Sequence, residues 1–178
     1  MDYALIMTEG TDEKAFLEAL LIKGILKFKP DELLHEEIYH ARQINNTMRV
    51  KISTLPSTDT VSIYRVGDKL SDKLKLGDLA ELGRITNIID ICILPELEIL
   101  FILNEGRYND YLKYKSRVKP SEYYKSINKS YNKQSSFVYD YFMKMSSNDI
   151  VKLIYLYVAK RGKSHKRDQH LILDLIND

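Results

Sequence analysis

The chain contains little cysteine and no long apolar run, and each absence excludes a class of protein. Cys92 is the only cysteine among 178 residues, which excludes an internal disulfide and a cysteine-based zinc cluster and is typical of a reducing compartment. The longest apolar candidate, residues 99–103, is far shorter than the roughly 18 residues of a membrane span. The first residues lack the basic-then-apolar pattern of a signal peptide. We therefore expect a cytoplasmic protein with no membrane partner.

Several common catalytic patterns are also missing. No serine occupies a nucleophile elbow, and no Ser/His/Asp or Cys/His arrangement is present. The basic loop 160–167 lacks the glycine spacing of a phosphate-binding P-loop. His35 and His40 are out of phase for chelating one metal if this segment is helical. Carboxylates remain as the candidates for chemistry.

Charge divides the chain into an acidic and a basic part. Residues 1–106 carry 12 Lys/Arg and 18 Asp/Glu, a net charge of −6, whereas residues 107–178 carry 15 and 7, a net charge of +8. This division suits a metal-dependent enzyme that acts on a polyanion, but two ordinary solvated surfaces would give the same counts. The length suits one domain with a helical appendage. We therefore divide the chain into an α/β domain, 1–106, and a basic helical extension packed on it, 107–178.

Apolar patterns predict alternating strands and helices in the first part. Strands are expected over residues 3–8, 60–66 and 88–94. A helix is expected to begin at Thr11, with Asp12 and Glu13 complementing the positive end of its dipole, and to stop at Gly24. This order favours a mainly parallel sheet flanked by helices.

Further helices are predicted from proline positions and from apolar spacing. Pro30 would open a helix near residue 31 with Leu34, Ile38 and Ala41 as its inward face. Pro95 would occupy the first turn of another helix. In the second part, helices are expected over residues 137–145, after an N-cap at Ser147 or Asn148, and over 169–176.

Carboxylates follow each of the three predicted strands. Glu9 follows the first, Asp68 the second with Asp72 four residues later, and Glu96 and Glu98 the third. The carboxyl ends of parallel strands share one edge of a sheet. Two residues apart on a helix, side chains diverge by about 200°, so only Glu98 of the last pair is expected to point into a shared site. Oxygen ligands without histidine or cysteine favour Mg²⁺ or Mn²⁺, which support phosphodiester cleavage.

Tyrosines and lysines interleave after residue 107. Aromatic rings beside cations suit a nucleic-acid surface, but tyrosines are equally common as the half-buried walls of small helical domains. The candidate nucleic-acid-binding residues are Lys69, Lys113, Lys115, Arg117, Lys119, Lys133, Arg161, Lys163, Lys166 and Arg167.

Residues 4–16, Ala-Leu-Ile-Met-Thr-Glu-Gly-Thr-Asp-Glu-Lys-Ala-Phe, resemble the first motif of the TOPRIM fold. Topoisomerases, bacterial primases, recombination mediators, ribosomal-RNA maturation nucleases and the overcoming-lysogenization-defect nucleases of phage defence share this fold. The resemblance implies that Glu9 is a general acid/base or metal ligand and that Asp12 matches an acid of the nuclease members. The family's Asp-x-Asp motif is reduced to Asp68, followed by Lys69, with Asp72 as a partial substitute.

The segment Pro-Glu-Leu-Glu at residues 95–98 resembles the downstream glutamate of small TOPRIM-like defence nucleases. The resemblance covers residues 1–106 and implies an Mg²⁺- or Mn²⁺-dependent nuclease, with a protein partner in a defence module as one further implication. Its catalytic residues would be Glu9, Asp68 and Glu98, and its metal-binding candidates are Glu9, Asp12, Asp68, Asp72, Glu96 and Glu98. The alternatives are a catalytically silent TOPRIM-derived module that binds nucleic acid or protein, and an α/β domain that docks a larger partner.

Overall fold

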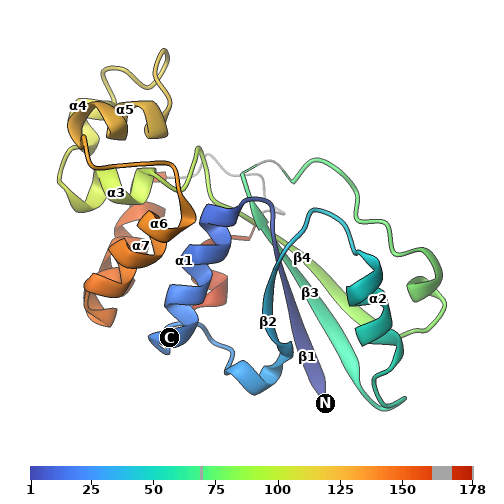
Figure 1. Cartoon of the computed structure of the whole chain (residues 1–178). Coiled ribbons are helices and arrows are strands. Elements are labelled where there is room, and N and C mark those ends of the chain that lie inside the picture. The colour runs from blue at the N-terminus through green and yellow to red at the C-terminus, as the bar shows by residue number, and fades with distance from the viewer. Residues whose placement is uncertain (69, 162–169, 178) are drawn as a thin grey trace.

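A four-stranded parallel sheet forms the centre of the molecule (Figure 1). The computed structural model describes residues 1–68, 70–161 and 170–177. The strand order is β2-β1-β3-β4, and all three neighbouring pairs are parallel. The strands are β1 (Asp2–Thr8), β2 (Leu33–His40), β3 (Thr60–Gly67) and β4 (Ile85–Cys92). The expected parallel sheet flanked by helices is therefore present.

Helices cover both faces of the sheet. The α-helices are α1 (Thr11–Ile22), α2 (Asn46–Ser53), α3 (Ile99–Asn104), α4 (Tyr108–Tyr111), α5 (Pro120–Ile127), α6 (Ser135–Lys144) and α7 (Ser147–Arg161). The described residues also form the short 3₁₀ helices η1 (Pro30–Glu32), η2 (Gly77–Ala80) and η3 (Ile172–Leu175). None of the helices in the described part of the chain is long and apolar enough to cross a lipid bilayer.

The alternation of β1 side chains separates two hydrophobic cores. Ala4 and Ile6 pack with α1 and the helices of the second part of the chain, whereas Leu5 and Met7 pack beneath α2 and η2. Successive strand residues point to opposite faces, and a central parallel strand is buried on both. This burial explains why residues 3–8 read as an almost continuous apolar run.

The segment after residue 30 contradicts the sequence prediction of a helix. Leu33–His40 forms the edge strand β2. Its register with β1 moves from Ala4 opposite Leu33 to Ile6 opposite Ile38, so three extra residues are accommodated within β2. His35 and Glu36 have φ angles of 55° and 57°. This irregularity removes the two-residue alternation, and the spacing of Leu34 and Ile38 then imitates a helix.

Two boundaries near the last strand also differ from the prediction. β4 ends at Cys92, two residues before the predicted end, and α3 begins only at Ile99. Pro95 therefore lies in the connecting loop and does not occupy a helical first turn. The first helical bond runs from the Ile102 N–H to the Glu98 carbonyl, at 3.2 Å. Residues 93–98 are a loop beside the sheet edge.

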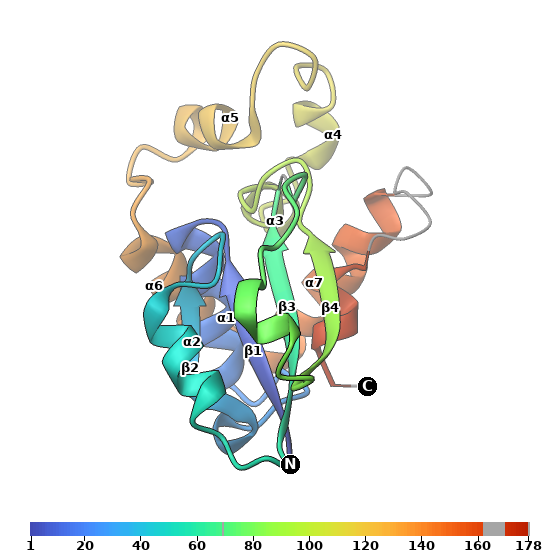
Figure 2. The same ribbon diagram turned by 90° about the vertical axis from the view of Figure 1, so that its right-hand side faces the viewer.

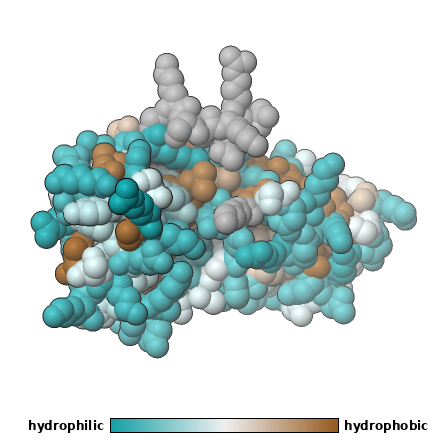
Figure 3. Space-filling model, turned by 90° about the horizontal axis from the view of Figure 1, so that it is seen from above, coloured by the Kyte–Doolittle hydropathy of each residue, from teal (hydrophilic) through white to brown (hydrophobic). Residues whose placement is uncertain are grey.

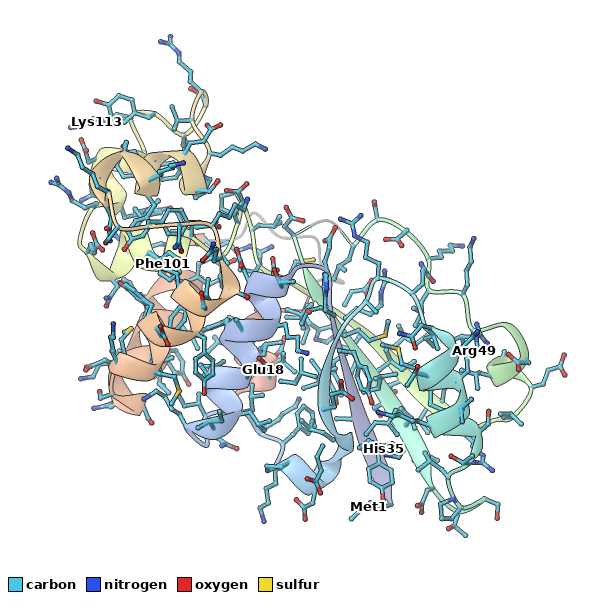
Figure 4. All side chains as sticks on the ribbon, viewed as in Figure 1. Met1, Glu18, His35, Arg49, Phe101 and Lys113 are labelled. Atoms are coloured by element: carbon cyan, nitrogen blue, oxygen red, sulfur yellow. The ribbon has the colours of Figure 1, made fainter. Side chains whose placement is uncertain are left out.

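The second part of the chain packs its helices around Phe101, which is fully buried (Figure 4). Its ring contacts Tyr124, Tyr131 and Phe142 among others. The predicted helix over 137–145 is confirmed as α6. Ser146 caps α7, because its hydroxyl accepts from the Asp149 N–H at 3.1 Å, one residue earlier than predicted. Residue 169 of the predicted closing helix lies outside the described residues, and the described remainder contains only the short η3.

In two perpendicular views, α4 and α5 extend beyond the carboxyl ends of the strands (Figure 1 and Figure 2). Seen from above, this end of the molecule is largely hydrophilic with separate apolar patches (Figure 3). The helices of the second part therefore stand beside the sheet edge at which the predicted carboxylates lie.

Candidate acidic site

A pocket of about 250 Å³ lies at the carboxyl edge of the sheet. It is lined by residues that follow β1, β3 and β4, as expected where parallel strands end. Five of the six metal-binding candidates are among them. The lining residues are Glu9, Gly10, Thr11, Asp12, Glu13, Arg42, Asp68, Glu96, Leu97, Glu98 and Lys133.

Glu9 is held at the end of β1 by both neighbouring strands. Its N–H donates to the Val66 carbonyl at 2.9 Å, and its own carbonyl lies 3.2 Å from His40 Nε2. Only 9% of its side chain is exposed, and its Oε1 lies 2.6 Å from Arg42 Nη2. The backbone fixes the position of Glu9, and Arg42 forms an ion pair with its carboxylate.

Gly67 allows this close approach. A Cβ atom at residue 67 would lie 2.6 Å from Glu9 Oε2 and 2.7 Å from Glu9 Cβ. Real side chains essentially never pack so tightly, and any substitution must move the glutamate. Gly67 is thus required by the position of Glu9 and not by a special backbone angle.

Glu98 is the fully buried carboxylate of the pocket, with 5% of the residue exposed. The Tyr131 hydroxyl donates to its Oε1 at 2.6 Å. Burial raises the pKa of Glu98, the Tyr131 hydrogen bond acts in the opposite direction, and the nearby Glu96 charge adds to the rise. Tyr131 thus connects the helical part of the chain directly to the acidic site.

Glu96 lines the same pocket as Glu98, contrary to the expectation that only one of them would. The expected divergence applies to helical residues, but the helix begins at Ile99. The Ser121 N–H donates to Glu96 Oε2 at 3.1 Å. The loop conformation therefore lets both carboxylates face one cavity.

Asp12 and Glu13 contribute two further carboxylates from the first turn of α1. Burial raises the pKa of both side chains. The charges of Asp12, Asp68 and Glu98 raise the pKa of Glu13 further, whereas Lys133 lowers that of Asp12. Sequence reasoning treated Glu13 only as a partner of the helix dipole, although its position beside Asp12 could have suggested this role.

Asp72 lies outside the pocket, so its proposed substitution for a motif aspartate has no support in the geometry. Its Oδ2 accepts from Gln43 Nε2 at 2.8 Å, and its Oδ1 lies 3.3 Å from Arg65 Nη2. The Gln43 hydrogen bond is the main cause that lowers the pKa of Asp72. The exposed Asp72 thus belongs to a polar contact between the loop that follows β3 and the loop that contains Gln43.

The donor set fits a hard divalent cation, because the pocket offers carboxylate oxygens and neither histidine nor cysteine. The side chains are not drawn together, however. Within residues 1–68, 70–161 and 170–177, no three His, Cys, Asp or Glu side chains form a group that could hold a metal ion. Arg42 and Lys133 supply positive charge at the pocket wall. A cation would therefore have to compete with Arg42 for Glu9.

Several tyrosines of the second part are structural. Tyr111, Tyr123, Tyr124 and Tyr131 are at most 5% exposed. Three of their hydroxyls donate to carboxylates within the fold: Tyr123 to Asp110, Tyr124 to Glu105 and Tyr131 to Glu98, each at 2.6 Å. The helical-wall interpretation thus holds for these four residues. They provide the framework of the extension and are not an open stacking surface.

The candidate nucleic-acid-binding cations divide into several groups. Lys133 lines the acidic pocket, and Lys113 pairs with Asp110 at 3.2 Å. Lys115, Arg117, Lys119 and Arg161 line two other pockets, which adjoin each other. The remaining candidates, Lys69, Lys163, Lys166 and Arg167, lie outside the described residues.

Comparison with other proteins adds no identification to this geometry. No protein-family model, no curated protein and no solved structure matches the chain.

Proposed function

We propose that the chain is a divalent-metal-dependent nuclease of the TOPRIM type that hydrolyses phosphodiester bonds. The observation that carries this proposal is the single pocket lined by acids from three strand ends. A packing role does not require so many carboxylates to share one cavity, because burying charge without compensation is costly. The link to phage defence rests on the sequence resemblance alone.

The proposed roles follow from position and burial. Asp68 and Glu98 would hold the cation, and Glu9 would act as general base or as a third ligand. Bound Mg²⁺ or Mn²⁺ activates water and neutralises charge on the phosphate. Asp12 and Glu96 line the same cavity and would be the further ligands. Lys133 supplies a cation that suits an incoming phosphate.

The raised pKa values support a site built for a cation. Burial raises the pKa of Asp12, Glu13 and Glu98, and neighbouring carboxylates raise those of Glu13 and Glu98 further. A bound divalent cation would offset both the burial of these carboxylates and the repulsion between them. Clustered, perturbed carboxylates in a cleft are characteristic of functional sites.

Glu9→Gln tests the proposal. We expect single-stranded DNA or RNA cleavage in Mg²⁺ to fall by at least about a hundredfold, as for the loss of a general base, while the thermal unfolding midpoint changes little. Glu81→Gln, at an exposed glutamate remote from the pocket, is the matched control and should cleave at the wild-type rate. Full activity of Glu9→Gln would contradict the assigned role.

Two observations favour the silent binding module as a second candidate. Arg42 lies 2.6 Å from Glu9, and no three candidate ligands in the described part of the chain form a metal-holding group. Calorimetric titration with Mg²⁺ and Mn²⁺ separates the candidates. The nuclease proposal predicts binding heat that is lost in Glu98→Gln, whereas the binding module predicts no carboxylate-dependent heat.

A further inference from the structure

A second pocket, of about 490 Å³, is bordered by the 93–98 loop, which also borders the acidic site. Its walls include the apolar side chains of Leu94, Ile99 and Leu103 and the rings of Tyr108 and Tyr111. The volume falls within the range of about 300–1,000 Å³ that is usual for small-molecule sites. The pocket is therefore large enough for one nucleotide.

The charge at this pocket is opposite to that of the acidic site. Lys115, Lys160 and Arg161 line it, and none of the described lining residues is Asp or Glu. Arg161 donates to the Cys92 carbonyl at 2.9 Å, and Lys160 Nζ lies 5.9 Å from the centre of the Tyr108 ring. Both cations are thus held near the pocket wall by contacts with the fold. The pocket combines apolar walls with positive charge.

A smaller pocket, of about 230 Å³, continues this surface. It shares Pro95, Tyr111 and Lys115 with the larger one and adds Arg117 and Lys119. Again, no described lining residue is acidic. Two adjoining cavities with cations and without carboxylates match an extended anion better than an isolated phosphate.

The same loop borders both the basic and the acidic cavities. Leu94 and Pro95 line the larger basic pocket, whereas Glu96, Leu97 and Glu98 line the acidic one. The connection between β4 and α3 thus places two cavities of opposite charge side by side. A ligand held in the basic pocket would be separated from the carboxylates by this loop.

We propose that the two basic pockets bind a single-stranded nucleic acid. One base would enter the larger pocket, stacking against Tyr108 and the apolar walls, while the flanking phosphates contact Lys115 and Lys160. The bound nucleic-acid chain would continue toward Arg117 and Lys119. A base buried in this way must be unpaired, which excludes a continuous duplex. The inference rests on the proposed function in one respect: the bound strand would be the substrate of the acidic site.

The test measures binding without cleavage. Fluorescence anisotropy of a labelled oligothymidylate of about twelve nucleotides, a length within usual single-strand site sizes, is followed in EDTA at several salt concentrations. Chelation removes metal-dependent cleavage, so binding and nuclease activity are judged separately. Unlabelled thymidine monophosphate and the matching duplex serve as competitors.

The lysine arm uses the double variant Lys115→Ala/Lys160→Ala. Each lost phosphate contact lowers the slope of log affinity against log salt by about 0.7 on single strands. We expect the slope to fall by about 1.4 and affinity at low salt to fall by about tenfold or more. The matched control is Lys144→Ala/Lys152→Ala, which removes two exposed lysines that do not line these pockets and should leave the slope unchanged.

The stacking arm uses Tyr108→Ala, with Tyr155→Ala as its control. Tyr155 is 52% exposed and does not line either basic pocket. Loss of one stacked base predicts about tenfold weaker binding with an unchanged salt slope, because no phosphate contact is removed. Circular dichroism and thermal unfolding establish that each variant is folded.

Three outcomes would overturn the proposal: binding by the lysine double variant that equals its control, competition by thymidine monophosphate as strong as by the oligonucleotide, or duplex binding as tight as single-strand binding. The second outcome would indicate a free-nucleotide site. Binding that depends on these residues, combined with no cleavage in Mg²⁺, would retain this inference and contradict the nuclease. Cleavage in Mg²⁺ together with binding that does not depend on these residues would contradict this inference and retain the nuclease.

Discussion

Glu13 illustrates how the acidic pocket acts on single residues. Burial and three neighbouring carboxylates raise the pKa of its side chain above the ordinary 4.5. In the pH range just above that value, the folded state then binds more protons than the unfolded state. The free energy of unfolding must therefore fall as the pH rises through this range. Asp12 and Glu98 act in the same direction, because the pKa of each is also raised.

The first residue-scale prediction concerns this pH dependence. Glu13→Gln should reduce the fall in unfolding free energy between about pH 5 and pH 8, because the amide cannot ionise. Urea unfolding at several pH values measures the slope. Glu81→Gln should retain the wild-type slope, and an equally steep slope in Glu13→Gln would contradict the assigned burial effect.

The second residue-scale prediction concerns Gly67. Gly67→Ala should displace Glu9, lower the unfolding free energy by about 1–3 kcal/mol as overpacking does, and strongly reduce Mg²⁺-dependent cleavage. Gly24→Ala is the comparison, because Gly24 has a φ of +65° and no neighbouring atoms at its Cβ position.

Gly24→Ala should cost about 1 kcal/mol from its left-handed conformation while cleavage persists. Urea unfolding and a cleavage assay on both variants separate lost stability from lost site geometry. Cleavage by Gly67→Ala at the rate of Gly24→Ala would show that Glu9 need not hold its observed position.

At the scale of elements, β2 shows how local irregularity conceals a strand. Leu33 and Ile38 contact β1 in register, but His35 and Glu36 have left-handed backbone angles between them. Non-glycine residues adopt that conformation at a cost. Pairing with β1 fixes the two ends of β2, so the extra residues must be accommodated in the middle.

This conformation gives the element-scale prediction. At position 36 a glycine variant should be more stable than an alanine variant by about 1 kcal/mol, because glycine tolerates positive φ. At position 37, where no positive φ occurs, alanine should be the more stable of the two by about 0.5–1 kcal/mol. Comparing Gly with Ala at each site cancels the loss of the glutamate itself. Urea denaturation of the four variants provides the measurement, and the same order at both sites would contradict the left-handed geometry.

For the molecule as a whole, one hydrophobic core connects the sheet with the helices of the second part. Ile6, Val66 and Ile91 belong to the same cluster as Phe101 and Phe142. Tyr131 also reaches from the helical part to Glu98. The acidic site therefore depends on the helical part both for packing and for one hydrogen bond.

The whole-molecule prediction follows from this shared core. Phe101→Ala should lower the unfolding free energy by about 3–5 kcal/mol, and far-ultraviolet circular dichroism and tyrosine fluorescence should report one common transition. Leu156→Ala, at a 40% exposed position on α7, should change the unfolding free energy by less than about 0.5 kcal/mol. Two separate transitions in the wild-type chain would show that the sheet and the helices unfold independently.

Sequence reasoning found the parts of the fold that follow simple periodicity. The apolar runs of β1 and β3, the helix beginning at Thr11, and the parallel arrangement were all predictable, because burial on one or both faces leaves a direct mark on residue order. The β2 strand and the start of α3 were not predictable. Their conformations depend on pairing with β1 and on a loop packed against α5, contacts between residues distant in sequence.

Residue order alone shows that Glu9, Asp68, Glu96 and Glu98 follow apolar segments, because strand periodicity stops there. Which carboxylates share a cavity follows from the three-dimensional fold. It brought Glu13 into the pocket and left Asp72 outside, because loop conformation and burial, not spacing, set the direction of each side chain. It also placed Tyr111, Tyr123, Tyr124 and Tyr131 in the core, since the same Tyr/Lys pattern serves a packed wall or a binding surface until its neighbours are known.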